Sequence, residues 1–287
     1  MTVRRVLSVC VMIAIAAIGS ASARDRAGAS SPYLALGDSI PFAYIDQARF
    51  EYLNPINFVG YPDWTGLAFS LDVANAGCPG ETTGSFLSTN APDNGCRLYR
   101  SLTHLHVNYG SAPTQFAYAT GFLQSHPDTA LVTLQLGGND VALLEEACHN
   151  DPQCIANGLP QVLATASANM ATILGGLRAT GYTGAIVIAN YYSTDYSNQT
   201  TTQIYAALNQ AITAPAPAFG AVVADVFSAF LAAVSNQYAQ GRTCAAGLLN
   251  AKSSVNNFFT CDVHPSQSGH KLITQAILGA DQPAHRK

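Results

Sequence analysis

The alternation of short apolar runs with longer amphipathic segments constrains the fold of this chain most strongly. The apolar runs are mostly continuous and several are rich in Val and Ile. That composition is typical of strands buried on both faces, as in a parallel sheet. We therefore expect strands at residues 33–36, 71–75, 131–136, 185–189 and 221–225.

Amphipathic stretches lie between these runs and predict helices. We expect helices at residues 61–70, 114–125, 159–180, 202–213, 226–240 and 265–278. Such an alternation predicts a three-layer α/β/α sandwich around a mostly parallel five-stranded sheet, with right-handed crossovers. Segments 43–57, 90–111 and 190–202 show no period, and we expect these loops to shape a substrate cleft.

The first 23 residues have the pattern of a signal peptide. Arg4 and Arg5 precede an apolar stretch at 6–18, and Ala21-Ser22-Ala23 offers a cleavage site of small residues. The apolar stretch is short for a membrane span. We predict a signal peptide at 1–23, cleaved near Ala23, and one secreted domain at 24–287 with its core at about 33–280.

Charge argues against a nucleic-acid partner. Only 10% of the residues are charged, and the net charge of −4 becomes about −6 once Arg4 and Arg5 are removed. Binding to phosphates needs clustered lysine and arginine. The sequence contains no such basic patch.

Six cysteines remain after the signal peptide, an even number that suggests three disulfides in an exported protein. Fifteen pairings are formally possible. Neighbouring cysteines give the simplest set, which is Cys78–Cys96, Cys148–Cys154 and Cys244–Cys261. No C-x-x-C pair is present, and an exported chain favours oxidation of its cysteines, so we expect no metal site.

Residues 34–40 read L-A-L-G-D-S-I, which places Ser39 where a short strand ends in a turn. A serine there is exposed, and the N–H groups of the next segment can point at whatever it attacks. By itself Gly37-Asp38-Ser39 is a weak signal, because many turns contain it by chance. A serine nucleophile also needs an adjacent base, and His264 is the natural candidate.

Gly80 and Asn139, like Ser39, lie within a few residues of a predicted strand end. Ligands of parallel sheets bind beyond the carboxyl ends of the strands, so the three residues are expected at one site. Each also has a structural interpretation. Gly80 could simply form a turn, Asn139 or Asp140 could cap a helix, and His264 could lie in a surface loop. We expect Asp140 to cap a helix while Asn139 faces the site.

Four blocks now stand in order: Gly37-Asp38-Ser39, Gly77-Cys78-Pro79-Gly80-Glu81-Thr82, Gly137-Gly138-Asn139-Asp140 and Asp262-Val263-His264-Pro265. Together they resemble the SGNH (GDSL) hydrolase family, especially its secreted actinobacterial esterases and lipases, over about residues 33–273. The resemblance implies a flavodoxin-like fold and hydrolysis of acyl esters without a cofactor. It implies Ser39 as nucleophile, His264 as base, and an oxyanion hole from Ser39, Gly80 and Asn139. We expect a monomer acting on small-molecule or lipid esters.

The fourth block departs from the family pattern, in which an aspartate lies three residues before the histidine. Here position 261 is Cys261, and Asp262 lies only two residues before His264. Either Asp262 reaches the imidazole through a local turn, or a backbone carbonyl near Cys261 orients the ring in its place. From the spacing we expect the two side chains not to close on one another. An Asp262→Asn change should then lower turnover by less than about a hundredfold.

Two other functions remain open at this point. A carbohydrate O-acetyl esterase would use the same fold and the same residues. A secreted binding protein would keep the fold without turnover, but it would be free to lose Ser39, Asn139 or His264, and all three are present. The α/β-hydrolase architecture is excluded, because no serine here lies in a G-x-S-x-G elbow.

Overall fold

A computed structural model describes residues 30–46, 54–252 and 260–281. Its centre is a parallel sheet of five strands in the order β2-β1-β3-β4-β5. The strands are β1 (Pro32–Gly37), β2 (Asp72–Asn75), β3 (Leu131–Gln135), β4 (Ala185–Ala189) and β5 (Val222–Ala224). This strand order is the flavodoxin-like one, so the predicted fold class is confirmed.

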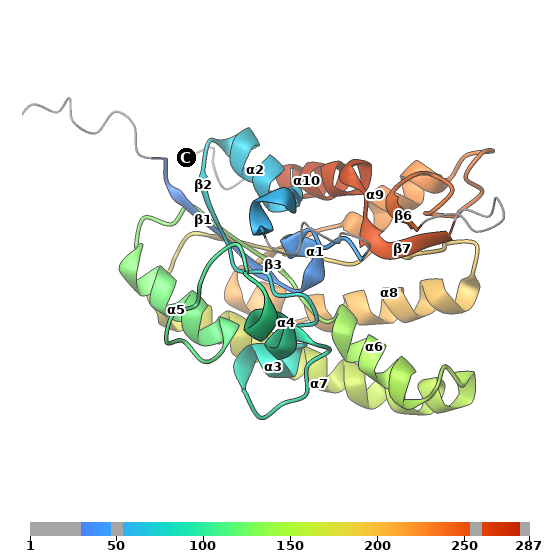
Figure 1. Ribbon diagram of the computed structural model, residues 1–287, viewed down its shortest axis with the longest axis horizontal. Coiled ribbons are helices and arrows are strands. Elements are labelled where there is room, and N and C mark those ends of the chain that lie inside the picture. Colours follow the sequence, from blue (N-terminus) through green and yellow to red (C-terminus); the bar gives the residue numbers. More distant parts are fainter. Residues whose placement is uncertain (1–29, 47–53, 253–259, 282–287) are drawn as a thin grey trace, which may run out of the picture.

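Helices cover both faces of the sheet (Figure 1). One layer contains α2 (Tyr61–Phe69), α9 (Val226–Val234) and α10 (Gln267–Asp281), with the short α1 (Ser39–Phe42) at the end of β1. The opposite layer contains α3 (Thr83–Leu87), α5 (Gln115–Ser125), α6 (Gly138–Ala147), α7 (Pro152–Ala179) and α8 (Gln199–Thr213). Two 3₁₀ turns, η2 (Pro55–Asn57) and η3 (Ala216–Phe219), and helix α4 (Cys96–Leu102) complete the described helical segments.

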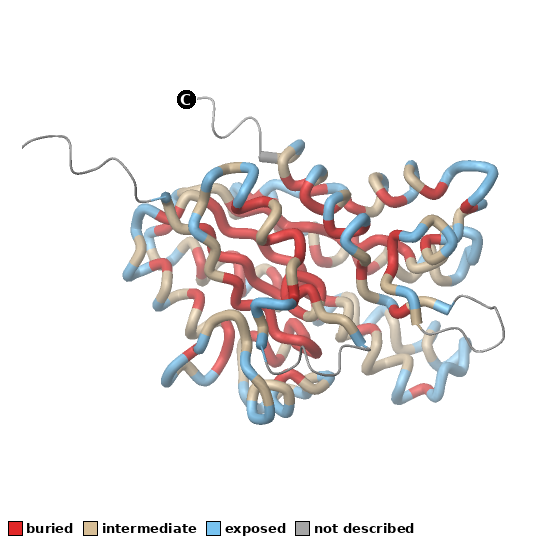
Figure 2. The backbone as a smooth tube through the Cα atoms, turned by 45° about the horizontal axis from the view of Figure 1, so that its top comes forward, coloured by how far each residue is buried: buried red, intermediate tan, exposed pale blue. Residues whose placement is uncertain are grey.

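The buried residues concentrate in the sheet and the helix faces against it (Figure 2). Every residue of β3 is buried, as expected for a central strand covered by helices on both sides. The described residues contain no helix that is both long and apolar enough to span a membrane. The predicted signal peptide at 1–23 lies outside the described residues.

All five predicted strands are present, and the helices differ mainly at their ends. Helix α7 begins at Pro152, seven residues before the predicted start, because Asp151 caps it by accepting a bond from the N–H of Cys154 at 2.7 Å. The helix continues through Pro160, which in the sequence resembles a start signal. Helix α6 was not predicted, and α4 lies within a segment expected to be a loop.

A two-stranded antiparallel hairpin stands outside the main sheet and was also not predicted. It consists of β6 (Leu249–Lys252) and β7 (Thr260–Pro265). The structure contains the disulfides Cys78–Cys96, Cys148–Cys154 and Cys244–Cys261, the same neighbouring pairs that the sequence favours. The third disulfide ties β7 to the segment before β6. Three disulfides indicate an oxidising, extracellular environment.

Arg178, near the end of α7, joins this helix to the turns that follow it. Its Nη1 donates to the carbonyls of Tyr182 and Gly184 at 3.1 and 2.7 Å, and its Nε donates to the carbonyl of Phe219 at 2.9 Å. The planar guanidinium therefore holds the connection to β4 and the turn η3 together.

We predict that Arg178→Ala lowers the free energy of unfolding by about 2 kcal/mol, because several carbonyls lose a charged donor. Denaturant unfolding measures the change. Arg178→Lys is the matched variant and should give an intermediate loss, because an ammonium cannot reproduce the fork of donors. An Arg178→Ala protein within about 0.5 kcal/mol of wild type would contradict this role.

Candidate active site

Ser39 lies at the carboxyl end of β1, where the chain leaves the sheet and begins α1. Gly37 makes this exit possible with a φ of +135°, and a Cβ at this position would lie 1.9 Å from the carbonyl oxygen of Gln135. Only glycine fits such a backbone. Ser39 is the first residue of α1. Its N–H, like the other N–H groups of the first turn, therefore has no acceptor within the helix.

Asp38 holds the start of α1 from within the protein. It is buried, its Oδ1 accepts the N–H of Ile40 at 2.9 Å, and its Oδ2 accepts a short hydrogen bond from the Tyr191 hydroxyl. Burial raises the pKa of Asp38 to about 6, although these two hydrogen bonds act to lower it. The bond to Tyr191 thus connects Asp38, and with it the start of α1, to the segment that directly follows β4.

His264 and Asp262 approach Ser39 from the β6–β7 hairpin, and β7 lies beside α1 (Figure 1). The Ser39 Oγ is 2.9 Å from His264 Nε2. On the other side of the ring, His264 Nδ1 is 2.7 Å from Asp262 Oδ1. The three side chains therefore form one continuous hydrogen-bonded row.

The expectation that Asp262 and His264 would not close on one another is wrong. Residues two apart on a strand share a face, as the spacing suggested, but Asp262 Oδ1 also accepts the backbone N–H of His264 at 3.4 Å. This local Asx-type turn brings the carboxylate up to the imidazole.

Asp262 is held in its charged form. Burial acts to raise the pKa of this carboxyl, but it is outweighed by the hydrogen bond and charge of His264 and by the backbone N–H groups of Asp46 and His264. The N–H of Asp46 donates to Asp262 Oδ2 at 3.1 Å. The net result is a lowered pKa, which suits an anion that orients an imidazole.

Gly80 and Asn139 lie on the wall of the same cavity as Ser39 and His264. Gly80 has a φ of +86°, and a Cβ there would lie 2.2 Å from the carbonyl oxygen of Asn94, so the position requires glycine. The Asn139 Nδ2 donates to the backbone carbonyl of Glu81 at 3.0 Å, and its Oδ1 accepts from Asn94 Nδ2 at 2.9 Å. Asn94 therefore contacts both residues, because its backbone N–H also donates to the Gly80 carbonyl at 2.7 Å.

Asp140 caps a helix, though not the one it belongs to. Helix α6 begins at Gly138, whereas the Asp140 carboxylate accepts the N–H and the hydroxyl of Thr83 at 2.9 and 2.5 Å. Thr83 is the first residue of α3. Asp140 therefore does not cap α6, whose N-cap is Gly137; instead its carboxylate joins α6, which contains Asn139, to the segment after Gly80.

The cavity has a volume of about 510 Å³ and is lined mainly by apolar and aromatic side chains. Helices α4, α6 and α8 supply much of this lining, which includes Leu98, Leu102, Val141, Ile204 and Tyr205. Leu98 and Leu102 are 63% and 71% exposed, so apolar surface continues from the cavity to its rim. All three segments expected to shape the cleft, 43–57, 90–111 and 190–202, contribute to its lining, for example with Tyr44, Leu98 and Tyr192.

Several polar residues around the site escaped the sequence-based interpretation. Tyr191, Gln115 and Glu81 are all buried near the hydrogen-bonded row of Ser39, His264 and Asp262. Their partners are 153, 78 and 34 residues away along the chain, so local motifs carry no signal of the pairing. The only hint at Glu81 in the sequence is its position directly after Gly80, inside the block at residues 77–82.

Comparison with known proteins also points to an ester hydrolase. Residues 35–272 match the model of the GDSL-like lipase/acylhydrolase family. No curated protein matches the chain at a significant level. Solved structures share the fold, among them a phospholipase A1 from Streptomyces albidoflavus NA297, at 17% identity and a TM-score of 0.56 over 88% of this chain and all of the other.

Two further structures show the same likeness. The lipase Lip_vut3 from a goat rumen metagenome has 13% identity and a TM-score of 0.53, covering 87% of this chain and 97% of the other. The acetylxylan esterase Axe2 from Geobacillus stearothermophilus has 16% identity and a TM-score of 0.50, covering 88% and 94%. At such identities the likeness shows the fold alone. The family model, which covers most of the chain, decides the rest: this protein belongs to the GDSL-like lipase/acylhydrolase family of ester-hydrolysing enzymes.

Proposed function

We propose that this protein is a serine esterase that cleaves carboxylic esters through an acyl-enzyme on Ser39. The observation that carries the proposal is the unbroken row from Ser39 Oγ to His264 Nε2 at 2.9 Å and from His264 Nδ1 to Asp262 Oδ1 at 2.7 Å. A serine is a weak nucleophile unless a base lies within hydrogen-bond reach, and here both the base and its orienting acid are in place.

In the proposed reaction, Ser39 Oγ attacks the ester carbonyl while its proton passes to His264 Nε2. The tetrahedral adduct collapses, and the imidazolium returns this proton to the leaving alkoxide, which departs as the alcohol. Water then repeats the sequence on the acyl-enzyme and releases the carboxylic acid. Throughout, Asp262 keeps Nδ1–H as the bonded tautomer and stabilises the positive charge on the ring.

The developing oxyanion needs donors that are already in place. We assign this role to the N–H of Ser39, the N–H of Gly80 and the side-chain amide of Asn139, all on the wall of the cavity. Asn139 Nδ2 carries two hydrogens, so its bond to the Glu81 carbonyl leaves one for the substrate. Each such donor is worth roughly 3–4 kcal/mol in the transition state.

The lining of the cavity favours a longer acyl chain over the two-carbon acetyl group. A cavity of about 510 Å³ with walls of Leu98, Leu102, Val141 and Ile204 is larger and more apolar than an acetyl group requires. Each buried methylene contributes about 0.8 kcal/mol to binding. We therefore place the substrate among esters of medium-length or longer fatty acids, with carbohydrate acetates as the competing class.

We predict that Ser39→Ala lowers kcat by at least about 10⁴-fold on a chromogenic acyl ester, because the nucleophile is lost. The thermal midpoint should stay near that of wild type. His264→Ala is the matched variant and should be equally inactive, since the two groups act as one unit. Wild-type activity should also disappear after treatment with a serine-directed phosphonate. Residual turnover of a few per cent in pure Ser39→Ala protein would disprove the assignment.

We predict that Asp262→Asn lowers kcat by about 10³- to 10⁴-fold while the protein stays folded, because an amide cannot stabilise the imidazolium and favours the wrong tautomer. Asp46→Asn is the control, because Asp46 donates to Asp262 through its backbone N–H, which the substitution keeps. That variant should keep its activity. If Asp262→Asn retained more than about one hundredth of kcat, a histidine oriented by the backbone would be the better description.

We predict that kcat/KM for an octanoyl ester exceeds that for the acetyl ester of the same alcohol by at least about tenfold. Leu98→Ser should reduce this ratio by removing apolar wall. The control is Leu67→Ser, which changes a leucine of similar exposure (72% against 63%) on α2, outside the cavity. A preference for acetyl esters that Leu98→Ser leaves unchanged would favour the carbohydrate O-acetyl esterase instead.

A further inference from the structure

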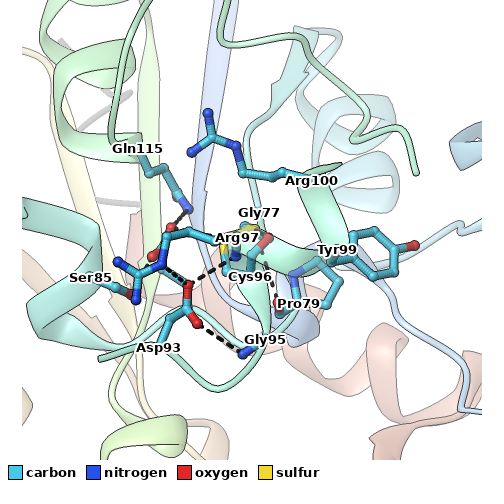
Figure 3. The surroundings of a disulfide bond; sticks show 12 residues. Gly77, Pro79, Ser85, Asp93, Gly95, Cys96, Arg97, Tyr99, Arg100 and Gln115 are labelled. Atoms are coloured by element: carbon cyan, nitrogen blue, oxygen red, sulfur yellow. Dashed lines mark hydrogen bonds and ion pairs between the residues drawn. A yellow bond between two sulfur atoms is a disulfide. The ribbon is translucent and has the colours of Figure 1, made fainter. Parts of the chain in front are cut away.

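Glu81, a buried acid, directly follows Gly80 in the loop between β2 and α3 (residues 76–82), which we call the oxyanion loop. Its side chain is 2% exposed, its Oε1 accepts the Ser85 hydroxyl at 2.5 Å, and its Oε2 accepts Gln115 Nε2 at 3.1 Å. Figure 3 shows Gln115 and Ser85 beside the disulfide of Cys96, whose sulfur lies 3.5 Å from Glu81 Oε2. Nothing in the chemistry proposed above uses this carboxyl.

The carboxyl does not sit in a metal site. One carboxylate oxygen and the sulfurs of Cys78 and Cys96 lie within 4.8 Å of one another, as metal ligands would. The two sulfurs, however, are bonded to each other in a disulfide, so neither is a thiolate. The contacts of Glu81 to Ser85 and Gln115 are instead hydrogen bonds between elements of the site.

Gln115 carries the connection from Glu81 to the nucleophile. Its Oε1 accepts the N–H of Gly37 at 2.7 Å, and its Nε2 donates to the Gly37 carbonyl at 2.9 Å as well as to Glu81. Gly37 lies two residues before Ser39. The amide of Gln115 therefore clasps the backbone that presents the Ser39 N–H and links it to the loop of Gly80.

The backbone of Glu81 completes the connection to the third donor. Its carbonyl accepts the bond from Asn139 Nδ2 at 3.0 Å. Glu81 is thus connected to all three residues assigned to the oxyanion hole, Ser39, Gly80 and Asn139. The connections are the Gln115 amide, the peptide bond to Gly80, and the Glu81 carbonyl.

We propose that Glu81 is a positioning residue for the oxyanion hole, in which its buried carboxyl, bonded to Ser85 and Gln115, sets the placement of the Gly80 N–H relative to the Ser39 N–H and Asn139. The inference rests on the proposed function, since it concerns the donors of that reaction. Glu81 itself touches no reacting atom. It acts through the loop, so its loss should weaken stabilisation of the transition state more than binding of the substrate.

The charge state of Glu81 selects the right conservative variant. Burial raises its pKa to about 7, while the bonds from Ser85 and Gln115 and the charge of Arg100 act to lower the pKa and Asp93 acts to raise it. The charge of Glu81 in turn acts to raise the pKa of the buried Tyr109. Below neutral pH the carboxyl is mainly neutral, and glutamine matches its shape and lack of charge. Its oxygen can accept the bond from Gln115 Nε2, while its NH2 group donates to the Ser85 hydroxyl oxygen.

The test compares Glu81→Ala with Glu81→Gln at about pH 6, on the ester that wild type prefers. We expect Glu81→Ala to lower kcat by about tenfold to a hundredfold with KM within about threefold, since displaced donors fail mainly in the transition state. Glu81→Gln should restore kcat to within about threefold of wild type. Affinity for a boronic acid, which forms a tetrahedral adduct on a serine hydroxyl, should fall in parallel with kcat.

Thr133→Ala serves as the control for a merely structural effect. It removes another fully buried polar group, the partner of the Tyr33 hydroxyl at 2.7 Å in the middle of the sheet. This variant should lose stability without a change in kcat. Glu81→Ala with kcat within about twofold of wild type, or a kcat loss that Glu81→Gln shares in full, overturns the inference.

Failure of the inference differs from failure of the proposed function. An inactive wild type, or an active Ser39→Ala variant, would reject the function. Active wild type with unaffected Glu81→Ala would reject only the inference. If Glu81→Ala does not fold, Ser85→Ala removes one hydrogen bond of the carboxyl and should still lower kcat by about threefold to tenfold at unchanged KM, and an unchanged kcat there overturns the inference.

Discussion

The exit of the chain from β1 at Gly37 is the constraint on which the rest of the site depends. The φ of +135° and the 1.9 Å that would separate a Cβ from the Gln135 carbonyl leave room for glycine alone. This turn points Ser39 out of the sheet, allows Asp38 to cap α1, and exposes both backbone groups of Gly37 to Gln115. The proposed nucleophile, the cap of α1 and the proposed oxyanion loop are therefore organised around a single backbone conformation.

The proposed base, His264, lies on a different part of the fold. His264 belongs to a hairpin outside the main sheet, which Cys244–Cys261 and the Tyr192 hydroxyl on the Val263 carbonyl at 2.6 Å fix in place. The distance from His264 Nε2 to Ser39 Oγ thus depends on how this hairpin is attached, not on the register of the parallel strands. A disulfide close to the histidine is a direct way to control that distance.

Much of the fold could be predicted from the sequence, because strands buried on both faces leave continuous apolar runs, as at 131–136 and 185–189. Ser39, Gly80 and Asn139 could be placed together because each follows such a run. The pairings of Tyr191 with Asp38 and of Gln115 with Glu81 could not, since they join segments that only the folded chain brings together. Asp262 was misjudged for a local reason: spacing along a strand does not reveal a side chain that bonds the backbone two residues on.

The bond between Asp140 and Thr83 has a consequence for how such an enzyme can diversify. It ties α6, which contains Asn139, to α3, which follows Gly80. The bond thus joins the two segments proposed to stabilise the oxyanion through residues that lie outside α4 and α8. Lining residues on those helices, such as Leu98, Leu102 and Ile204, can therefore be substituted without moving the groups proposed to react. New substrate preferences can then arise by mutation of the walls alone, with the reacting groups held in register.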